Sequence, residues 1–259
     1  MKISQILLLL LVLTAQILFI ASRLYSVSDI IGMSHGVLPV GAVHFYCVAT
    51  KPHSRLDRML QVFEQKNETL NVLEMGSKVK VGWGAHAFGL KIKALYDFIH
   101  STNVSSDDLV VGFDAYDVAY TGSTEEIKSR YIAMNKPVVF GAETKNSPDL
   151  KREYPQANLK EYFPFLNSGL LVGKVWALRE LMEGYVFNPK EDDQRYWTTK
   201  YLERPDLIVL DHHNVLFLNC YRIHMQNLLN INGTATYEGA HPLFIHGNGP
   251  SKHCLKNFD

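Results

Sequence analysis

Short apolar runs alternate with longer amphipathic segments along the chain from about residue 43 onward. Apolar runs of about four to eight residues bounded by turn residues are typical of buried strands, and apolar positions spaced three or four apart are typical of helices. The pattern predicts, in chain order, strand 44–49, helix 54–68, strand 71–74, helix 89–100, strand 109–113, helix 124–135 and strand 138–142. Strands that alternate with helices indicate a largely parallel sheet covered on both faces.

The second half of this region continues the pattern. It predicts a strand at 170–173, a helical stretch at 175–183 and a final pair of strands near 207–210 and 243–245. The chain therefore belongs to the α/β class. In such sheets ligands bind beyond the carboxyl ends of the strands, where Thr50 and Asp114 fall.

The N-terminus carries an apolar run from residue 6 to 21, interrupted only by Thr14 and Gln16. This run is slightly long for a signal-peptide core and slightly short for a membrane span. Both alternatives stay open. An uncleaved type II anchor is marginally favoured, because Phe19 occupies a position at which signal peptidase prefers a small residue. We expect residues 1–25 to be an anchor or signal peptide, 26–42 a short stem, and 43–259 one folded domain.

The charge balance and the glycosylation sequons bear on the binding partners and the cellular compartment of the protein. The 26 basic residues balance the 26 acidic ones, so the chain has no basic field that would favour a nucleic-acid partner. Glycosylation sequons at Asn67, Asn103 and Asn232 favour the lumen of the endoplasmic reticulum or Golgi. In that oxidising lumen Cys220 and Cys254 could form a disulfide.

Two carboxylates, Asp114 and Asp117, follow the predicted buried strand 109–113. Two like charges at such a short separation repel each other unless a cation lies between them. Carboxylate oxygens suit Mn²⁺ or Mg²⁺, and a cation there would bridge a nucleotide diphosphate. The alternative is that both residues cap a turn at the end of the strand.

The turn 246–252 near the C-terminus has a composition suited to an anion. Its two glycines flank Asn248 and let backbone N–H groups approach a ligand closely, while His246 can complete a metal site and Lys252 can meet a phosphate. A plain terminal turn explains Asn248 and Gly249 equally well, but it does not explain the flanking His246 and Lys252.

Two further polar turns are candidates for contacts with a sugar. Asn167 and Ser168 precede the predicted strand 170–173, either as a simple turn or as hydrogen-bonding groups for hydroxyls. Asp192 and Asp193 lie in an acidic turn, which is either solvated or able to stabilise an oxocarbenium-like centre. The candidate catalytic residues are therefore Asp192, Asp193 and Asn167.

The order of these motifs resembles the N-terminal glycosyltransferase domain of the procollagen lysyl hydroxylases. The similarity extends from about Val43 to Lys252 and is carried by segments 45–50, 113–118, 141–143, 154–155, 165–169, 192–194, 210–212 and 246–252. The resemblance implies a GT-A fold and transfer of glucose from a UDP-sugar, with Mn²⁺, to galactosyl-hydroxylysine of collagen.

The resemblance also implies roles for individual residues. By motif position Asp114, Asp117 and His246 match the metal ligands, and Tyr116 matches an aromatic residue that packs on uridine. The remaining nucleotide contacts that it implies are Val48, Thr50, Trp83, Lys91, Asn248, Gly249 and Lys252.

The chain departs from that family in two respects. Residues 143–148 lack the aromatic-rich segment that the family has near the acceptor, so the acceptor stays open. The sequence also ends shortly after the transferase motifs, and we expect no hydroxylase domain. The alternatives are a galactosyltransferase on the same scaffold, a UDP-sugar-binding protein without turnover, and a metal-dependent phosphoesterase. The phosphoesterase is disfavoured because the sequence offers no obvious second set of metal ligands.

Overall fold

The computed structural model describes residues 40–79, 88–147, 149, 154–155 and 157–258. Residues 40–259 form a unit separate from residues 1–39. The anchor or signal peptide expected at 1–25, nearly all of the expected stem and the predicted nucleotide contact Trp83 lie outside the described residues. Within the described residues, no helix combines the length and apolar character needed to cross a membrane.

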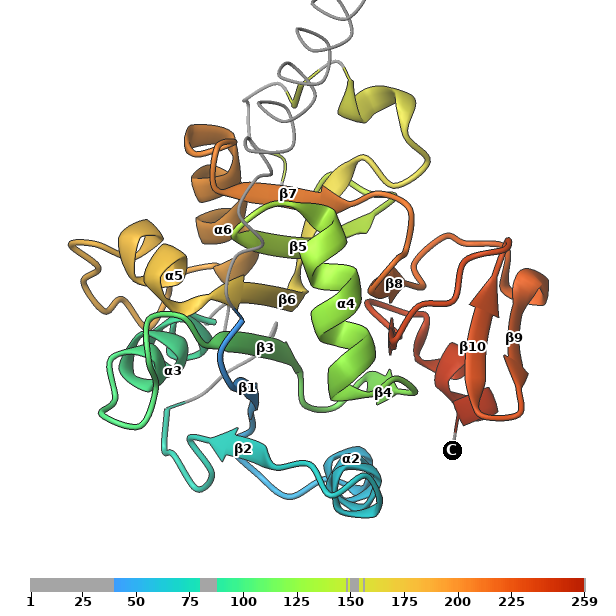
Figure 1. Ribbon diagram of the computed structural model, residues 1–259, viewed down its shortest axis with the longest axis horizontal. Coiled ribbons are helices and arrows are strands. Elements are labelled where there is room, and N and C mark those ends of the chain that lie inside the picture. The colour runs from blue at the N-terminus through green and yellow to red at the C-terminus, as the bar shows by residue number, and fades with distance from the viewer. Residues whose placement is uncertain (1–39, 80–87, 148, 150–153, 156, 259) are drawn as a thin grey trace, which may run out of the picture. The chain divides into compact units, whose positions relative to one another are not determined.

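The centre of the domain is a six-stranded sheet with the order β2-β1-β3-β6-β5-β7 (Figure 1). The chain forms these strands at Val43–Val48 (β1), Leu70–Leu73 (β2), Leu109–Asp114 (β3), Val138–Glu143 (β5), Phe165–Lys174 (β6) and Ile208–Asp211 (β7). Neighbouring strands are parallel except that β6 runs antiparallel to β3 and β5. The predicted α/β class with a mostly parallel sheet is confirmed.

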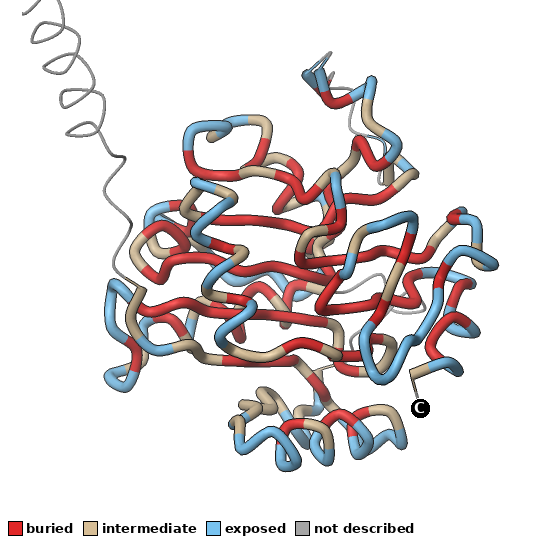
Figure 2. Tube along the Cα trace, turned by 45° about the vertical axis from the view of Figure 1, so that its right-hand side comes forward, coloured by how far each residue is buried: buried red, intermediate tan, exposed pale blue. Residues whose placement is uncertain are grey.

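Helices cover both faces of this sheet, as the alternating pattern predicts. They span Ser54–Gln65 (α2), Gly89–Ile99 (α3), Thr124–Met134 (α4), Val175–Leu181 (α5) and Asp193–Glu203 (α6), with 3₁₀ turns at Asn158–Lys160 (η2), Met225–Asn227 (η3) and Lys252–Phe258 (η4). Buried side chains of α3, α5 and α6 pack in one apolar cluster, and those of α2 and α4 in another. In β3, Val110 faces the first cluster while Leu109 and Val111 face the second. The strands β3, β5 and β6 are buried along most of their length, and Figure 2 shows the buried segments gathered in the middle of the domain.

A second, smaller sheet joins distant parts of the chain. It contains β4 (Val118–Tyr120), β8 (Phe217–Asn219) and β11 (Phe244–His246), in the order β4-β11-β8. A separate hairpin pairs β9 (Leu228–Ile231) with β10 (Thr234–Tyr237). The hydrophobic pattern predicts β11 but misses β4, β8, β9 and β10.

The sequence prediction is also wrong about the start of α6, which it treats as an acidic turn. Asp192 is the N-cap of α6, and its carboxylate accepts a hydrogen bond from the Arg195 N–H at 2.9 Å. Asp is among the favoured N-cap residues because its oxygen satisfies a free N–H of the first turn. The buried Trp197 and Tyr201, four residues apart, carry the helical period that would have revealed α6.

The cysteines of the described residues are buried free thiols. Cys220 follows β8, Cys254 lies in η4, and the nearby Cys254 together with burial raises the pKa of the Cys220 thiol. The two thiols that the sequence suggests as a pair are therefore neighbours, in the reduced form.

Replacing Asp211 by Ala should lower the free energy of unfolding by about 3 kcal/mol or more. Asp211 ends β7, is fully buried, and accepts hydrogen bonds from the N–H groups of Val215, Leu216 and Phe217 at 2.8, 2.7 and 2.9 Å. Alanine leaves these donors buried without an acceptor. Urea denaturation measures the effect, and Asp206→Ala, an exposed carboxylate, is the control. An unchanged unfolding midpoint for Asp211→Ala would contradict this role.

Candidate active site

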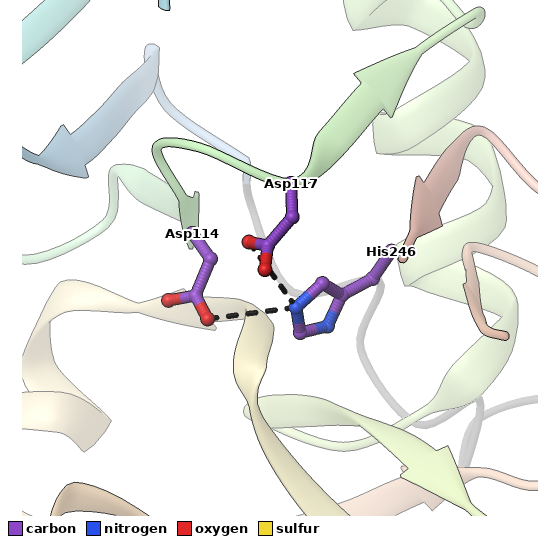
Figure 3. A group of neighbouring side chains, drawn as sticks. All are labelled: Asp114, Asp117 and His246. Atoms are coloured by element: carbon purple, nitrogen blue, oxygen red, sulfur yellow. Dashed lines mark ion pairs between the residues drawn. The ribbon is translucent and has the colours of Figure 1, made fainter. Parts of the chain in front are cut away.

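The carboxylates of Asp114 and Asp117 converge on the imidazole of His246 (Figure 3). One ligand atom from each residue lies within 4.8 Å of the others, and His246 Nε2 is 3.5 Å from Asp114 Oδ2 and 3.6 Å from Asp117 Oδ1. Two carboxylate oxygens and one imidazole nitrogen are donors that suit Mn²⁺ and also accept Mg²⁺. The structure thus brings together the three residues that the sequence predicts as metal ligands.

Three strands hold this cluster in place. Asp114 ends β3, Asp117 precedes β4, and His246 ends β11, which pairs antiparallel to β4 with His246 opposite Val118. The Gly247 N–H also donates to the Asp117 carbonyl at 2.8 Å. Residues far apart in the sequence therefore meet because β4 and β11 pair.

Asn219, which the sequence analysis does not identify, orients the imidazole. Its side-chain oxygen lies 2.8 Å from His246 Nδ1, while its amide nitrogen donates to the Ala142 carbonyl at 2.9 Å. Nδ1 therefore donates to Asn219, and Nε2 faces the two carboxylates. A hydrogen bond of this kind fixes the ring orientation of a metal-binding histidine.

The charges in the cluster balance one another. Burial lowers the pKa of His246, but its contacts with the carboxylates of Asp114 and Asp117 outweigh burial and raise this pKa to about 10. Burial raises the pKa of Asp114, but the charge of Lys91 and the contact with His246 hold it well below its usual range. A protonated imidazole and an ammonium group thus compensate the carboxylates of the cluster.

Lys91, on the first turn of α3, connects the cluster to the acidic residues of α6. Its Nζ lies 2.6 Å from Asp114 Oδ1 and 2.7 Å from Asp193 Oδ2. Burial lowers the pKa of Lys91, but the two carboxylates more than offset this and raise it above its ordinary value. The ammonium group therefore lies between a metal-ligand candidate and a catalytic candidate.

The two neighbouring aspartates that the sequence analysis leaves as alternatives have different environments. Asp193 is buried, pairs with Lys91 and accepts a hydrogen bond from Ser168 Oγ at 3.1 Å. Asp192 is less buried, and its carboxylate is used in capping α6. Asp193 is therefore the carboxylate that points inward.

Glu143, at the end of β5, is a buried carboxylate that the sequence analysis does not assign to the site. Its Oε1 accepts hydrogen bonds from Asn167 Nδ2 at 2.9 Å and Gln194 Nε2 at 2.7 Å, and its Oε2 accepts one from Asn248 Nδ2 at 3.1 Å. Burial raises its pKa. Its position after the buried strand 138–142 is the same signal that identifies Asp114.

The predicted nucleotide contacts at β1 lie beside the turn after β3. Val48 is the register partner of Asp114. The Tyr116 hydroxyl accepts hydrogen bonds from the N–H groups of Thr50 and Lys51 at 3.1 and 3.2 Å and donates to the Lys51 carbonyl at 3.0 Å. The structure therefore brings Val48, Thr50 and Tyr116 together beside the metal-ligand candidates.

The turn after β11 reaches the same region. Gly249 has φ +59°, a conformation that favours glycine, and Asn248 accepts a hydrogen bond from the Tyr221 N–H at 2.8 Å. The exposed Lys252 has its Nζ 3.3 Å from Asp117 Oδ2.

A cavity of about 240 Å³ is lined both by the metal-ligand candidates Asp114 and Asp117 and by Asp192 and Asp193. The predicted site residues in its lining are Lys91, Asp114, Asp117, Asn167, Asp192, Asp193, His246, Asn248 and Gly249. Val48, Thr50, Tyr116 and Lys252 do not line it. A larger cavity of about 650 Å³, beside His212 and Tyr237, contains none of the predicted site residues.

The chain is similar to known proteins over most of its length. The sequence profile of the family described as PLOD GT domain matches residues 40–259. A multifunctional procollagen lysine hydroxylase and glycosyltransferase of Caenorhabditis elegans is 31% identical over 227 residues, which are 80% of this chain and 30% of the relative. Procollagen-lysine,2-oxoglutarate 5-dioxygenase 2 of Homo sapiens is 29% identical and covers 85% of this chain and 32% of the relative.

The chain is also similar to an uncharacterized protein, R699, of Acanthamoeba polyphaga mimivirus, at 32% identity over 66% of this chain and 37% of that protein. It spans about a third of the length of these relatives. Among solved structures, a glycosyltransferase involved in glycosylation of the major capsid of PBCV-1 matches with a TM-score of 0.48 and 12% identity, over 83% of this chain and 99% of that one. The profile covers nearly all of the described domain, and the chain belongs to the PLOD GT domain family of glycosyltransferases.

Proposed function

We propose that this glycosyltransferase moves a hexose, most simply glucose, from a UDP-sugar to a galactosyl-hydroxylysine or similar hydroxyl of a collagen-like protein, with Mn²⁺ as cofactor. The observation that carries the proposal is one cavity that contains both the Asp114, Asp117 and His246 cluster and the buried Asp193. The first cluster suits a metal-bound diphosphate, and Asp193 suits the sugar next to it.

On the nucleotide side, each residue has a distinct task. Asp114, Asp117 and His246 would hold the cation, which when bound supplies positive charge to the diphosphate and stabilises UDP as the leaving group. The exposed ammonium of Lys252, beside Asp117, can contact the same diphosphate. The backbone N–H groups around Gly249 can approach a phosphate because no Cβ intervenes.

On the sugar side, Asp193 supplies negative charge where positive charge develops at the anomeric carbon. Lys91 and Ser168 fix the orientation of its carboxylate. Asn167 and Gln194 share the Glu143 carboxylate as acceptor, so this part of the wall is preorganised. No side chain is assigned as a nucleophile, and front-face transfer with retention needs none.

We further propose that the domain works in the lumen of the secretory pathway. The three sequons at Asn67, Asn103 and Asn232 all have exposed asparagines, where a glycan can be attached without disturbing the core.

Release of UDP from a panel of UDP-sugars, with and without Mn²⁺ and a galactosyl-hydroxylysine peptide, tests the proposed function. We expect release from UDP-glucose that requires Mn²⁺ and increases with the peptide. Preference for UDP-galactose would identify a galactosyltransferase. Binding of UDP-sugars without release on any acceptor would favour a binding protein and contradict the proposal.

The affinity for Mn²⁺ alone should rise by about tenfold per pH unit between pH 6 and 8. The raised pKa of His246, about 10, means that the imidazole is protonated over this range, so a cation must displace one proton. The carboxylate of Asp114 does not titrate there, because its pKa lies well below the usual range. Calorimetric titration of the protein with Mn²⁺ measures the slope. A pH-independent affinity would contradict ligation by His246, and His246→Gln should remove the slope.

A further inference from the structure

Three residues that line the cavity have no role in the proposed function: Lys145, Ser147 and Tyr221. Lys145 and Ser147 come from the loop after β5, and Tyr221 comes from the turn after β8. The loop after β5 is where the chain lacks the aromatic-rich segment expected from its family. Tyr221 places an aromatic ring at this wall from a different part of the chain.

Two cations lie over the Tyr221 ring. Lys145 Nζ is 5.8 Å from the ring centroid, and Arg222 Cζ is 5.2 Å from it. Both side chains belong to exposed residues, and neither forms an ion pair within the described part of the chain. An aromatic face attracts each cation separately, but two like charges beside one ring repel each other. An anion bound there is attracted by both.

The turn that carries Arg222 is held in an uncommon conformation. Arg222 has φ +61°, in the left-handed region that residues other than glycine rarely adopt. The Tyr162 hydroxyl donates to the Arg222 carbonyl at 3.2 Å, and Thr144 Oγ1 donates to the Tyr221 carbonyl at 2.8 Å. Backbone conformations of this kind persist where surrounding contacts fix them, and they concentrate at ligand sites.

The same turn is tied to the site already described. The Tyr221 N–H donates to Asn248 Oδ1 at 2.8 Å, and Asn248 donates in turn to Glu143. The backbone of Tyr221 is therefore fixed relative to the cavity. Lys145 lines the cavity, and Arg222, which does not line it, follows Tyr221 directly in the chain.

Besides the donor diphosphate, a second anion could bind at only one part of the described cavity lining, because most of the lining is negatively charged. Asp114, Asp117, Asp192, Asp193 and Glu143 make most of the wall negative, and the ammonium of Lys91 is already engaged by two of these carboxylates. In the proposed function, the diphosphate of the donor binds at the part of the cavity that His246 lines. The wall at Lys145 and Tyr221 is thus the part that can face the acceptor.

We propose that Lys145 and Arg222 bind a carboxylate of the acceptor polypeptide, carried by a residue close to the hydroxyl that receives the sugar. The enzyme thereby prefers acidic segments of a collagen-like chain over neutral ones. This inference rests on the proposed function, because it takes the cavity to be the transfer site.

Two fluorescent collagen-like peptides test the inference. Both carry one galactosylated hydroxylysine, and the flanking triplets contain Glu in one peptide and Gln at the same positions in the other. Fluorescence anisotropy in the presence of Mn²⁺ and UDP measures their affinities. We expect the Glu peptide to bind the parent protein about tenfold more tightly, and we expect this difference to shrink with salt.

The preference should disappear in the double variant Lys145→Gln with Arg222→Asn. Asparagine removes the charge and tolerates the left-handed backbone, and the thermal midpoint checks the fold. Lys200→Gln is the matched control, because Lys200 lies 5.6 Å from the Tyr196 ring centroid in α6 and does not line the cavity. This control should keep the preference.

Several results would overturn the inference: equal affinity for the two peptides, no binding of either peptide, or a preference that survives in the double variant. Loss of Mn²⁺-dependent UDP binding in the double variant would also overturn it, since the two cations would then serve the donor. Transfer of glucose to the Gln peptide as efficiently as to the Glu peptide would reject the inference while supporting the proposed function. A parent protein that does not bind UDP with Mn²⁺ would instead reject the proposed function.

Discussion

Replacing Asp114 or Asp117 by Ala is expected to abolish Mn²⁺-dependent binding of UDP, with a loss of affinity of at least about a hundredfold. Both carboxylates lie at the cavity and not in the apolar core, with 28% and 16% of their side chains exposed. The fold should therefore persist. In the Asp114→Ala variant Lys91 keeps its contact with Asp193, so no buried charge is left without a partner.

Isothermal titration calorimetry with UDP, with and without Mn²⁺, measures this effect, and circular dichroism checks the fold. Asp206→Ala removes an exposed carboxylate outside the cavity and should bind UDP as the parent does. Undiminished Mn²⁺-dependent affinity in either site variant would contradict the metal assignment.

The substitution Asp193→Asn should reduce sugar transfer by about a hundredfold or more while the affinity for UDP stays within a few-fold of the parent value. Asparagine keeps the shape and the hydrogen bond from Ser168 but removes the charge that would face the anomeric carbon. A group that acts only in the transition state changes kcat and leaves ground-state binding nearly unchanged.

The neighbour Asp192 provides the matched control. Its carboxylate caps α6, and Asn is an equally good N-cap, so Asp192→Asn should transfer sugar at close to the parent rate. Initial rates of UDP release at saturating donor compare the two variants. If Asp193→Asn retains the parent rate, the buried carboxylate has no part in transfer and serves only to pair with Lys91.

The sheet could be predicted where strands are buried on both faces. Runs such as residues 109–113 and 138–142 are continuously apolar, and the observed strands β3 and β5 extend each run by only one residue. The antiparallel direction of β6 could not be predicted, because no local pattern distinguishes it from a parallel strand. The helix predicted at 54–68 ends at Gln65, since Asn67 adopts a left-handed conformation with φ +54°.

The metal-ligand candidates could be predicted because each follows a strand at a polar turn. Their common position depends on the pairing of β4 with β11, which the sequence pattern does not show. Asn219 was missed as a site residue for the same reason, whereas Glu143 ends a buried strand as Asp114 does and could have been identified by that signal. Each acts through contacts with residues more than about twenty positions away, such as His246 for Asn219 and Asn167 for Glu143.

The most direct test of the proposed function is mass spectrometry of a galactosyl-hydroxylysine peptide after incubation with the protein, UDP-glucose and Mn²⁺. We expect the peptide to gain one hexose on the galactose. The gain should be absent without Mn²⁺ and absent with the Asp114→Ala variant. A peptide that stays unmodified, although the protein binds UDP-glucose in the same sample, would contradict the proposal that this domain glucosylates a collagen-like acceptor.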